Sequence, residues 1–344
     1  MQYIGNLIRD TYTNFENWRN YSNSRKQAHH LMKKVIEKRG HSVVDKKVLK
    51  KIKSYSNETF GSPDYWPWLA LYTEIRGEFL EGWIPDDYYS FELIPKLNPQ
   101  PISMLSTIKS FDHRIFSNFT IEPLGLKISN SFFTPTLEKI SFTDFKKILS
   151  DHNDEVVIKL DGGPSGGGIE FKNSNDVKES DFKDAEDYVV QPCIKQHESI
   201  GKLFQKSVNT IRIGTFLSEK GEVKVILKVM RFGRGESRID NLVGGGGFIS
   251  LNNEGRGSNF GYDHNGEIIG QHHPDSEFKF DDLQVPYFKK ILKACRKSHL
   301  LFPYTKYIAW DVCVTEDGEI KFLEWNTRKP AFWCFEATIG PIWN

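Results

Sequence analysis

The chain has few cysteines, no long apolar run and almost no net charge. Its four cysteines, Cys193, Cys295, Cys313 and Cys334, lack the close spacing of metal-binding or redox-active pairs. We therefore expect a reduced, cytoplasmic protein without disulfide bonds. No apolar run approaches the roughly 18 residues that span a bilayer. A formal net charge of +1 excludes a chain that is strongly acidic or polyanion-binding as a whole.

The N-terminal region is basic and has the apolar periodicity of helices. It opens with MQYIGNLIRD, which carries charges by residue 9 and lacks the apolar core of a signal peptide. From Arg19 to Lys53 there are twelve lysines and arginines against two acids, Glu37 and Asp45. This run fits a solvated helical face, and it also fits a landing patch for an anionic polymer or a membrane surface. A connector rich in proline and aromatic residues, 61–100, ends the region near residue 95.

From about residue 100 the pattern changes to short strands, turns and glycine-rich loops. Strands are predicted at Val156–Leu160, Ile169–Lys172, Tyr188–Gln191, Thr210–Leu217, Val223–Met230, Tyr307–Thr315 and Ile320–Trp325. Helices are predicted at Leu137–Leu149 and Tyr287–Ser298. Antiparallel hairpins with few helices indicate α+β lobes and not a doubly wound parallel sheet.

A lysine precedes a loop of five glycines in VVIKLDGGPSGGGIEF, residues 156–171. A P-loop has the reverse order, with glycines first and Gly-Lys-Ser/Thr at the start of a helix. Side chains alternate along Val156–Leu160, so Lys159 leaves a strand in a fixed direction. The loop Gly162–Gly168 allows close backbone approach, and its N–H groups are able to hold phosphate oxygens. A hairpin tip with an ordinary lysine is the alternative.

Two later segments fit the same kind of ligand. In DYVVQPCIKQH the strand Tyr188–Gln191 breaks at Pro192, and such a hinge offers backbone groups to the edge of an adenine ring. A plain linker between lobes has the same pattern. In SVNTIRIGTFL, Arg212 interrupts an otherwise apolar strand. Its guanidinium fork suits a phosphate, and it equally suits an internal carboxylate.

The C-terminal hairpin YIAWDVCVTEDGEIKFLEWN brings two carboxylates together. Asp317-Gly318 is a strong signal for a two-residue turn. Counting back from that turn gives three cross-strand pairs: Val312 with Leu323, Trp310 with Trp325, and Asp311 with Glu324. Carboxylates about 5 Å apart repel one another unless a cation lies between them. Two carboxylates and the amide of Asn326 suit Mg²⁺, and a solvent-facing pair of no consequence is the alternative.

The ordered set of motifs, from the lysine before GGPSGGG to FLEWN, resembles the ATP-grasp superfamily over roughly residues 100–344. It is most similar to the sugar-transfer-associated ATP-grasp group of polysaccharide biosynthesis. The resemblance implies the ATP-grasp fold, an α+β fold in which two lobes with antiparallel sheets grip ATP. It implies a first lobe with the glycine-rich lid at 96–192 and a second lobe with the metal-binding hairpin at 193–344, after a mainly helical region at 1–95.

The resemblance also implies roles for single residues. The expected nucleotide-binding set is Lys109, Lys159, Gly166, Gly167, Gly168, Gln191, Pro192, Cys193, Ile194, Asp311 and Glu324. The expected Mg²⁺ ligands are Asp311, Glu324 and Asn326, and the expected catalytic residues are Arg212, Lys159 and Arg231. Asp240 and Asn241 precede four glycines that are expected in the acceptor pocket.

The function implied is an ATP- and Mg-dependent carboxylate–amine ligase that acts through an acyl phosphate. Its partners would be small or sugar-linked carboxylates and amines, and polysaccharide-assembly enzymes; neither nucleic acid nor a membrane span is expected. One rival reading is a phosphotransferase acting on a sugar or on histidine, with His264, His272 and His273 as candidates. The other is a non-catalytic nucleotide-binding subunit of a glycan-assembly complex.

Overall fold

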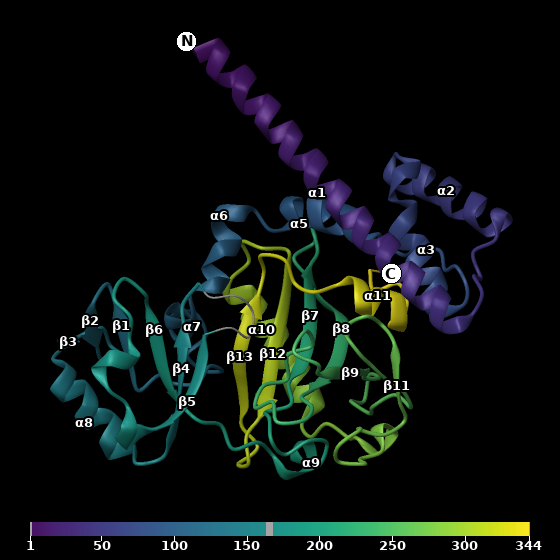
Figure 1. Cartoon of the computed structure of the whole chain (residues 1–344). Coiled ribbons are helices and arrows are strands. Elements are labelled where there is room, and N and C mark those ends of the chain that lie inside the picture. Colours follow the sequence, from purple (N-terminus) through teal and green to yellow (C-terminus); the bar gives the residue numbers. More distant parts are fainter. Residues whose placement is uncertain (1, 163–167, 344) are drawn as a thin grey trace. The chain divides into compact units, whose positions relative to one another are not determined.

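The computed structural model describes residues 2–162 and 168–343, and for residues 2–15 and 17 it describes the backbone alone (Figure 1). The chain forms two units. Unit 1 consists of Met1–Leu97, Asn265–Glu267 and Ala331–Asn344, and unit 2 of Asn98–His264 and Ile268–Pro330. Residues 331–344, which the sequence-based division placed in the second lobe, thus pack with the N-terminal helices. The divisions at residues 95 and 192 stay predictions.

Unit 1 is helical, as expected. Its longer helices are α1 (Gln2–Arg39), α2 (Lys46–Phe60), α3 (Trp66–Arg76) and α11 (Trp333–Ile339). Its short turns are η1 (Pro63–Tyr65), α4 (Asp86–Tyr88), the π-helical turn η2 (Tyr89–Leu93) and α5 (Ile94–Leu97). Asp45 caps α2 by accepting a hydrogen bond from the Val48 N–H at 2.7 Å, because the first N–H groups of a helix have no partner within it.

The core of unit 1 is aromatic and includes Trp68, Tyr72 and Trp83, all fully buried. Glu336 of α11 is also buried there, and its carboxylate accepts backbone hydrogen bonds from Ile84 at 2.9 Å and Ile342 at 3.0 Å. Burial raises the pKa of Glu336 to about 8. This carboxyl therefore ties the C-terminal segment to the N-terminal helices.

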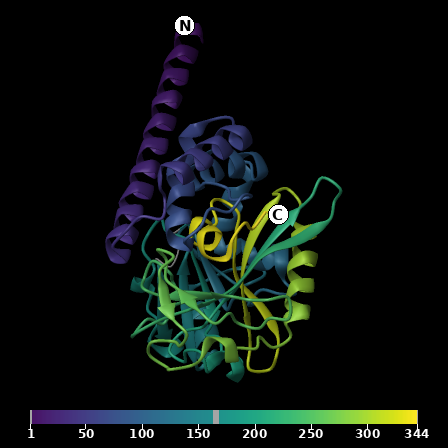
Figure 2. The same ribbon diagram turned by 90° about the vertical axis from the view of Figure 1, so that its right-hand side faces the viewer.

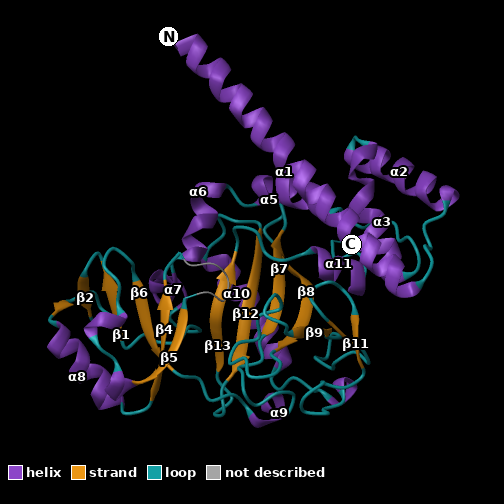
Figure 3. Ribbon diagram, in the orientation of Figure 1, coloured by secondary structure: helices purple, strands orange, loops and turns teal. Residues whose placement is uncertain are grey.

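The first sheet of unit 2 has the strand order β3-β2-β1-β6-β4-β5, and every pairing is antiparallel. Its strands are β1 (Gly125–Ile128), β2 (Ser131–Phe133), β3 (Lys139–Ile140), β4 (Glu155–Leu160), β5 (Ile169–Asn173) and β6 (Tyr188–Pro192). Helix α8 (Phe142–His152) packs on this sheet (Figure 3). It begins later than predicted, because Leu137 has a φ of +66° and Ser141 caps the helix through the Asp144 N–H.

The second sheet has the order β11-β10-β9-β8-β7-β12-β13 and is also antiparallel. Its strands are β7 (Ile211–Leu217), β8 (Val223–Phe232), β9 (Gly247–Ser250), β10 (Gly261–Tyr262), β11 (Ile268–Gly270), β12 (Tyr307–Val314) and β13 (Ile320–Asn326). Helix α10 (Phe288–Leu301) covers one face of it and completes the main core, which includes Trp310, Phe322 and Trp325. All seven strands predicted from the sequence are present, with ends within two residues.

Short elements connect the sheets of unit 2. They are α6 (Gln100–Ser103), η3 (Met104–Thr107), α7 (Lys109–Phe116), η4 (Ser174–Asp176), η5 (Glu179–Asp181), α9 (Glu198–Gly201) and η6 (Phe280–Asp282). Within the described part of the chain, no helix combines the length and apolarity needed to cross a lipid bilayer.

The C-terminal hairpin confirms the predicted pairs Trp310–Trp325 and Asp311–Glu324 but corrects the register near the turn. The turn has three residues, because the Thr315 N–H bonds to the Glu319 carbonyl at 2.9 Å. A β-bulge between Asp311 and Val312 then restores the register, and Val312 pairs with Phe322 instead of Leu323. The turn and the bulge each shift the register by one residue, in opposite directions, so Asp311 still pairs with Glu324 as predicted.

This register predicts unequal costs for two neighbouring truncations. Phe322 is 3 % exposed and lies in the core, whereas Leu323 is half-buried. We expect Phe322→Ala to lower the free energy of unfolding by about 3 kcal/mol or more and Leu323→Ala by about 1 kcal/mol. Urea unfolding followed by tryptophan fluorescence measures both. Equal costs, or a larger cost at Leu323, would contradict the bulged register.

Candidate active site

The charged centre of unit 2 is Asp311 on β12, on the sheet face opposite the core residues Trp310 and Val312. The Arg212 guanidinium donates two hydrogen bonds to its carboxylate, from Nε to Oδ1 at 2.8 Å and from Nη2 to Oδ2 at 2.7 Å. Arg231 donates a third from Nη1 to Oδ2 at 3.1 Å. Burial by itself raises the pKa of Asp311, but the two guanidinium groups hold it below its usual value.

A second carboxylate extends this network. Asp240 accepts hydrogen bonds from the backbone N–H and the hydroxyl of Thr210, and it lies 3.4 Å from Arg231 in an ion pair. Arg231 also donates to the Asp240 carbonyl at 3.0 Å, while its Nε is buried without a hydrogen-bond partner among the described residues. Asp240 lies at the start of the four-glycine loop. Arg231 therefore links this loop, where the acceptor pocket is expected, to Asp311.

Glu324 and Asn326 lie beside Asp311, as predicted. The Asn326 amide donates to Asp311 Oδ2 at 3.4 Å. Burial and the nearby Asp311 charge raise the pKa of Glu324. Among the residues that the structure describes, Glu324 makes no side-chain hydrogen bond or ion pair. Its carboxylate is thus an available oxygen ligand next to Asp311. The described residues hold no cluster of three or more His, Cys, Asp and Glu side chains suited to a metal ion, so a metal here would need the amide or other ligands.

The two predicted lysines come together at the end of β4. The Lys109 amine donates to the carbonyl of Leu160, the residue after Lys159, at 3.0 Å. Burial lowers the pKa of Lys159, and the charges of Asp112 and Glu324 oppose that shift. Within the described chain, the Lys159 amine has no hydrogen-bond or ion-pair partner. The first sheet thus presents an unpaired ammonium close enough to Glu324 for their charges to interact.

Two carboxyls that the sequence analysis missed support these lysines. Asp161 accepts hydrogen bonds from the backbone N–H of Ser110, at 3.0 Å, and from its hydroxyl, which joins the first turn of α7 to the end of β4. Asp112 is buried, accepts from Trp325 Nε1 at 2.7 Å and has a pKa well above its usual value because of burial. The spacing of Asp112, three residues after Lys109 and so on the same side of a helix, could have marked it as a candidate site residue.

The predicted lid is described only at its ends. Gly166 and Gly167 lie outside the described residues. Gly168 has a φ of +75°, and a Cβ there would lie 2.7 Å from the Leu160 Cβ, so this position requires glycine. The Gly168 carbonyl accepts from the Leu160 N–H at 2.8 Å, which closes the base of the loop directly after Lys159.

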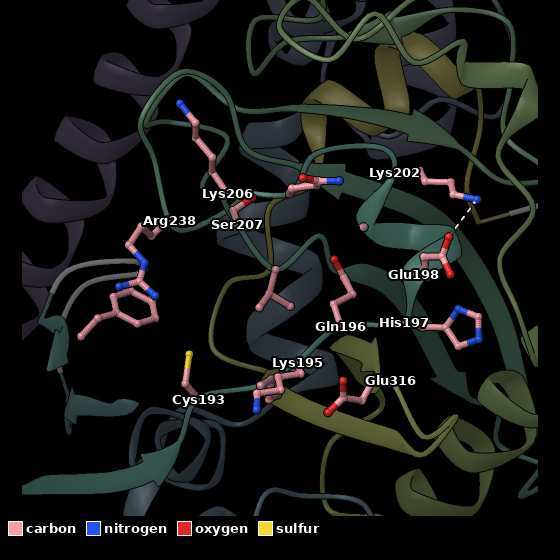
Figure 4. A pocket seen from close by; sticks show the side chains of 15 residues that line it. Cys193, Lys195, Gln196, His197, Glu198, Lys202, Lys206, Ser207, Arg238 and Glu316 are labelled. Carbon is pink, nitrogen blue, oxygen red and sulfur yellow. Dashed lines mark ion pairs between the residues drawn. The ribbon is translucent and has the colours of Figure 1, made fainter. Parts of the chain in front are cut away.

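The hinge residues Gln191, Pro192, Cys193 and Ile194 lead from β6 to a polar cavity of about 740 Å³. Gln191 donates to the Ile121 carbonyl at 3.1 Å, and its Oε1 is buried with no partner among the described residues. Burial raises the pKa of the Cys193 thiol to about 11. Figure 4 shows Cys193 and Arg238 along one side of the cavity, with His197 and Glu198 along the other.

Arg238 closes the cavity against the first sheet. Its guanidinium forks onto the Glu155 carboxylate at 2.6 and 2.5 Å, and it lies over the Phe171 ring at 3.9 Å from the centroid. Gln196 points into the cavity (Figure 4) and bonds to Asn209, with its amide donating to the Asn209 carbonyl at 2.6 Å. Arg238 and Gln196, neither of which was predicted, thus link the wall of the cavity to Glu155 of the first sheet and to Asn209, two residues before β7.

Comparison with known proteins places this geometry in a family. Residues 88–341, most of the chain, match the family described as sugar-transfer associated ATP-grasp. The chain belongs to this family. It is thereby part of the ATP-grasp superfamily, and the expected α+β fold with two antiparallel sheets is confirmed. No curated protein matches significantly.

Solved structures with similar folds are distant in sequence. N5-carboxyaminoimidazole ribonucleotide synthetase from Thermotoga maritima is 12% identical, with a TM-score of 0.38 over 67% of this chain and 44% of that one. D-Alanine–D-alanine ligase from Bacillus anthracis is 16% identical, with a TM-score of 0.35 over 64% and 57%. D-Alanyl-alanine synthetase A from Vibrio cholerae is 13% identical, with a TM-score of 0.41 over 80% and 67%. The chain spans about half the length of the first two of these structures.

The candidate histidines of this family member differ in environment. His273 is fully buried; its Nε2 lies 2.9 Å from the Gly233 carbonyl and its Nδ1 accepts from the Asp275 N–H at 3.1 Å. Both ring nitrogens are therefore occupied, which argues against His273 as a phosphoryl acceptor. His264 is half-buried and His272 is exposed.

The ion pair at Asp311 predicts strong coupling in stability. We expect Arg212→Met to lower the free energy of unfolding by about 3 kcal/mol, because it leaves a buried carboxylate with less compensation. Adding Asp311→Asn should recover most of that loss, as measured by a double-mutant cycle in urea. The cost of Arg212→Met should shrink as the pH falls below 3.8, because the pKa of Asp311 is depressed and its contribution disappears on protonation. Additive effects of the two substitutions would argue against the pair.

Proposed function

We propose that this chain is an ATP- and Mg-dependent ligase that joins a carboxylate to an amine. The observation that carries the proposal is the row of Arg212, Asp311 and Glu324 across three neighbouring strands of unit 2 in an ATP-grasp family member, with Lys159 near enough for the Glu324 charge to oppose the lowering of its pKa. An unpaired ammonium and an unpaired carboxylate cost stability when half-buried, unless a ligand uses them. Such a pair suits a nucleotide phosphate on one side and a cation on the other.

ATP would bind along the hinge and the lysines. Backbone groups of Gln191–Ile194 would contact the adenine, as would Gln191 Oε1, which has no partner within the described part of the chain and could accept from the exocyclic amine. Lys159 and Lys109 would neutralise the phosphates. The ordered bonds from Lys109 to Leu160 and from Ser110 to Asp161 hold both lysines at the same strand end, which supports this role.

The donor set fits Mg²⁺. Glu324, Asn326 and Asp311 would supply two carboxylates and an amide, the hard oxygen ligands that this ion prefers. Asp311 would do so once its oxygens, which now accept hydrogen bonds from Arg212 and Arg231, are released. When bound, Mg²⁺ would offset charge on the phosphates during transfer. The Arg212 and Arg231 guanidinium groups, now on Asp311, would be the cations that bind a substrate carboxylate or an acyl phosphate. The Arg231 Nε, which has no partner among the described residues, supports that role.

The reaction would proceed in two steps, phosphoryl transfer to the carboxylate and then attack by the amine. A substrate carboxylate oxygen attacks the γ-phosphorus and displaces ADP, which gives an acyl phosphate. An amine then attacks the acyl carbon, phosphate leaves and the amine loses a proton, which gives an amide. The chain's residues bind, orient and exclude water. We propose a sugar or an amino acid of surface polysaccharide biosynthesis as the substrate, and the cytoplasm as the site of action.

The experiment is a matrix of candidate carboxylates and amines assayed for ADP and phosphate release with Mg²⁺. ADP that forms only when both partners are present supports the ligase. A stable phosphorylated sugar or protein in place of an amide would instead support a phosphotransferase. Nucleotide binding by calorimetry without turnover for any pair would support a non-catalytic role.

Once a carboxylate and an amine that react have been found, the role of Lys159 can be tested with them. We expect Lys159→Ala to lower kcat/KM for ATP by roughly 100-fold or more, because it removes a fixed charge from the phosphates. Chelation of Mg²⁺ should abolish ADP release. Lys224→Ala, an exposed lysine on β8, is the matched control and should behave as wild type. Turnover by Lys159→Ala equal to that of Lys224→Ala would rule out the proposed site.

A further inference from the structure

The outer face of α10 carries a concentration of positive charge that the proposed function does not use. The helix, FKKILKACRKSHLL, contains five cations and no acid. These are Lys289, Lys290, Lys293, Arg296 and Lys297, all exposed. Among residues 2–162 and 168–343 none of them has an ion-pair partner. Lys289, Lys293 and Lys297 follow at i, i+4 and i+8, a spacing at which like charges repel.

Exposed apolar side chains continue the same face. Leu300 and Leu301, the last two residues of α10, are 55% and 48% exposed, and Tyr304, three residues after the helix ends, is 65% exposed. The other side of α10, with Phe288, Ile291 and Cys295, is buried against the second sheet. A contiguous group of exposed large apolar residues indicates an interaction surface when it borders a charged one.

We propose that this outer face of α10 binds the surface of an anionic lipid bilayer. The lysines would lie at the headgroups, with Leu300, Leu301 and Tyr304 in the interfacial layer, where leucine and tyrosine are favoured. Clusters of four to eight lysines and arginines on an amphipathic helix are typical of anionic-lipid binding. A nucleic acid would use the charge but not the exposed leucines. The proposal goes beyond the proposed function and does not rest on it.

The position of α10 is compatible with an active enzyme at a membrane. The helix packs on the face of the second sheet that carries Trp310 and Val312, whereas Arg212 and Asp311 project from the opposite face. In Figure 2, α10 is the yellow-green helix at the right, beside the strands of this sheet. A bilayer against α10 therefore has the sheet between it and the charged centre.

Helix α2 supplies a matched comparison. Lys46, Lys47 and Lys50 are exposed and, within the described chain, unpaired, and no exposed large apolar residue lies on α2. Replacing three lysines there changes the net charge of the protein as much as replacing three on α10. The comparison separates binding by this local surface from a general attraction of exposed lysines to anionic lipid.

The test is co-sedimentation of the full chain with vesicles of phosphatidylcholine, alone or with about one third phosphatidylglycerol. The wild type should bind the anionic vesicles and leave the neutral ones. The variant K289Q/K293Q/K297Q should bind about 100-fold more weakly, since each lysine near the surface contributes about fivefold. L300S/Y304S should also lose binding, while K46Q/K47Q/K50Q should keep most of it. Thermal unfolding midpoints equal to that of the wild type establish that each variant is folded.

Four results would overturn the proposal. They are failure of the wild type to prefer anionic vesicles, equal loss in the α2 and α10 lysine variants, full binding by L300S/Y304S, and binding of a DNA duplex through the α10 lysines without binding of vesicles. ATP binding measured on the same samples is independent of all four, so a failure here leaves the ligase proposal untouched.

Discussion

The buried ion pair between Arg212 and Asp311 is the interaction on which the rest of the candidate site depends. Arg212, Asp311 and Glu324 are directly opposed on three neighbouring strands, β7, β12 and β13. Two carboxylates side by side in a buried sheet repel each other, and the arginine in the same row offsets one of them. The remaining carboxylate, Glu324, is then the group whose charge is left for a ligand.

The same pair explains why neighbouring residues are polar. Arg231 on β8 donates a hydrogen bond to Asp311. Asp240 forms an ion pair with Arg231 and also accepts a hydrogen bond from the Thr210 backbone N–H. Each charge in this chain of contacts has an opposite charge as its neighbour, which keeps the burial cost low. Removal of one member leaves the charge of its neighbour without a partner, so the network behaves as a unit.

The sequence predicts the strands and the charged row well because both follow from local patterns. Alternation identifies β4, β7, β12 and β13, and the residues on the site face of each can be counted. Asp112, Asp161 and Arg238 were missed because their partners Trp325, Ser110 and Glu155 lie 51 to 213 residues away in the chain. No periodicity marks such pairs, which form only when distant segments of the chain come together in the fold.

The glycine-rich loop was predicted from its composition, and one described position in it shows a physical need for glycine. Gly168 needs its positive φ and its missing Cβ to close on Leu160. Short strands such as β3, β10 and β11 escaped prediction because two or three residues carry too little alternation to stand out. The start of α8 was misplaced for a similar reason, since a cap at Ser141 outweighs the apolar Leu137.

The β-bulge on β13 separates the tip of the C-terminal hairpin from its chemistry. The extra residue absorbs the one-residue offset set by the turn, so Phe322 and Trp325 both reach the core while Glu324 faces Asp311. Changes of length at the tip can therefore be taken up by the strand before they displace the carboxylate. The row of charges is thus fixed by the turn and the bulge acting together, and neither of them alone sets the pairing of Asp311 with Glu324.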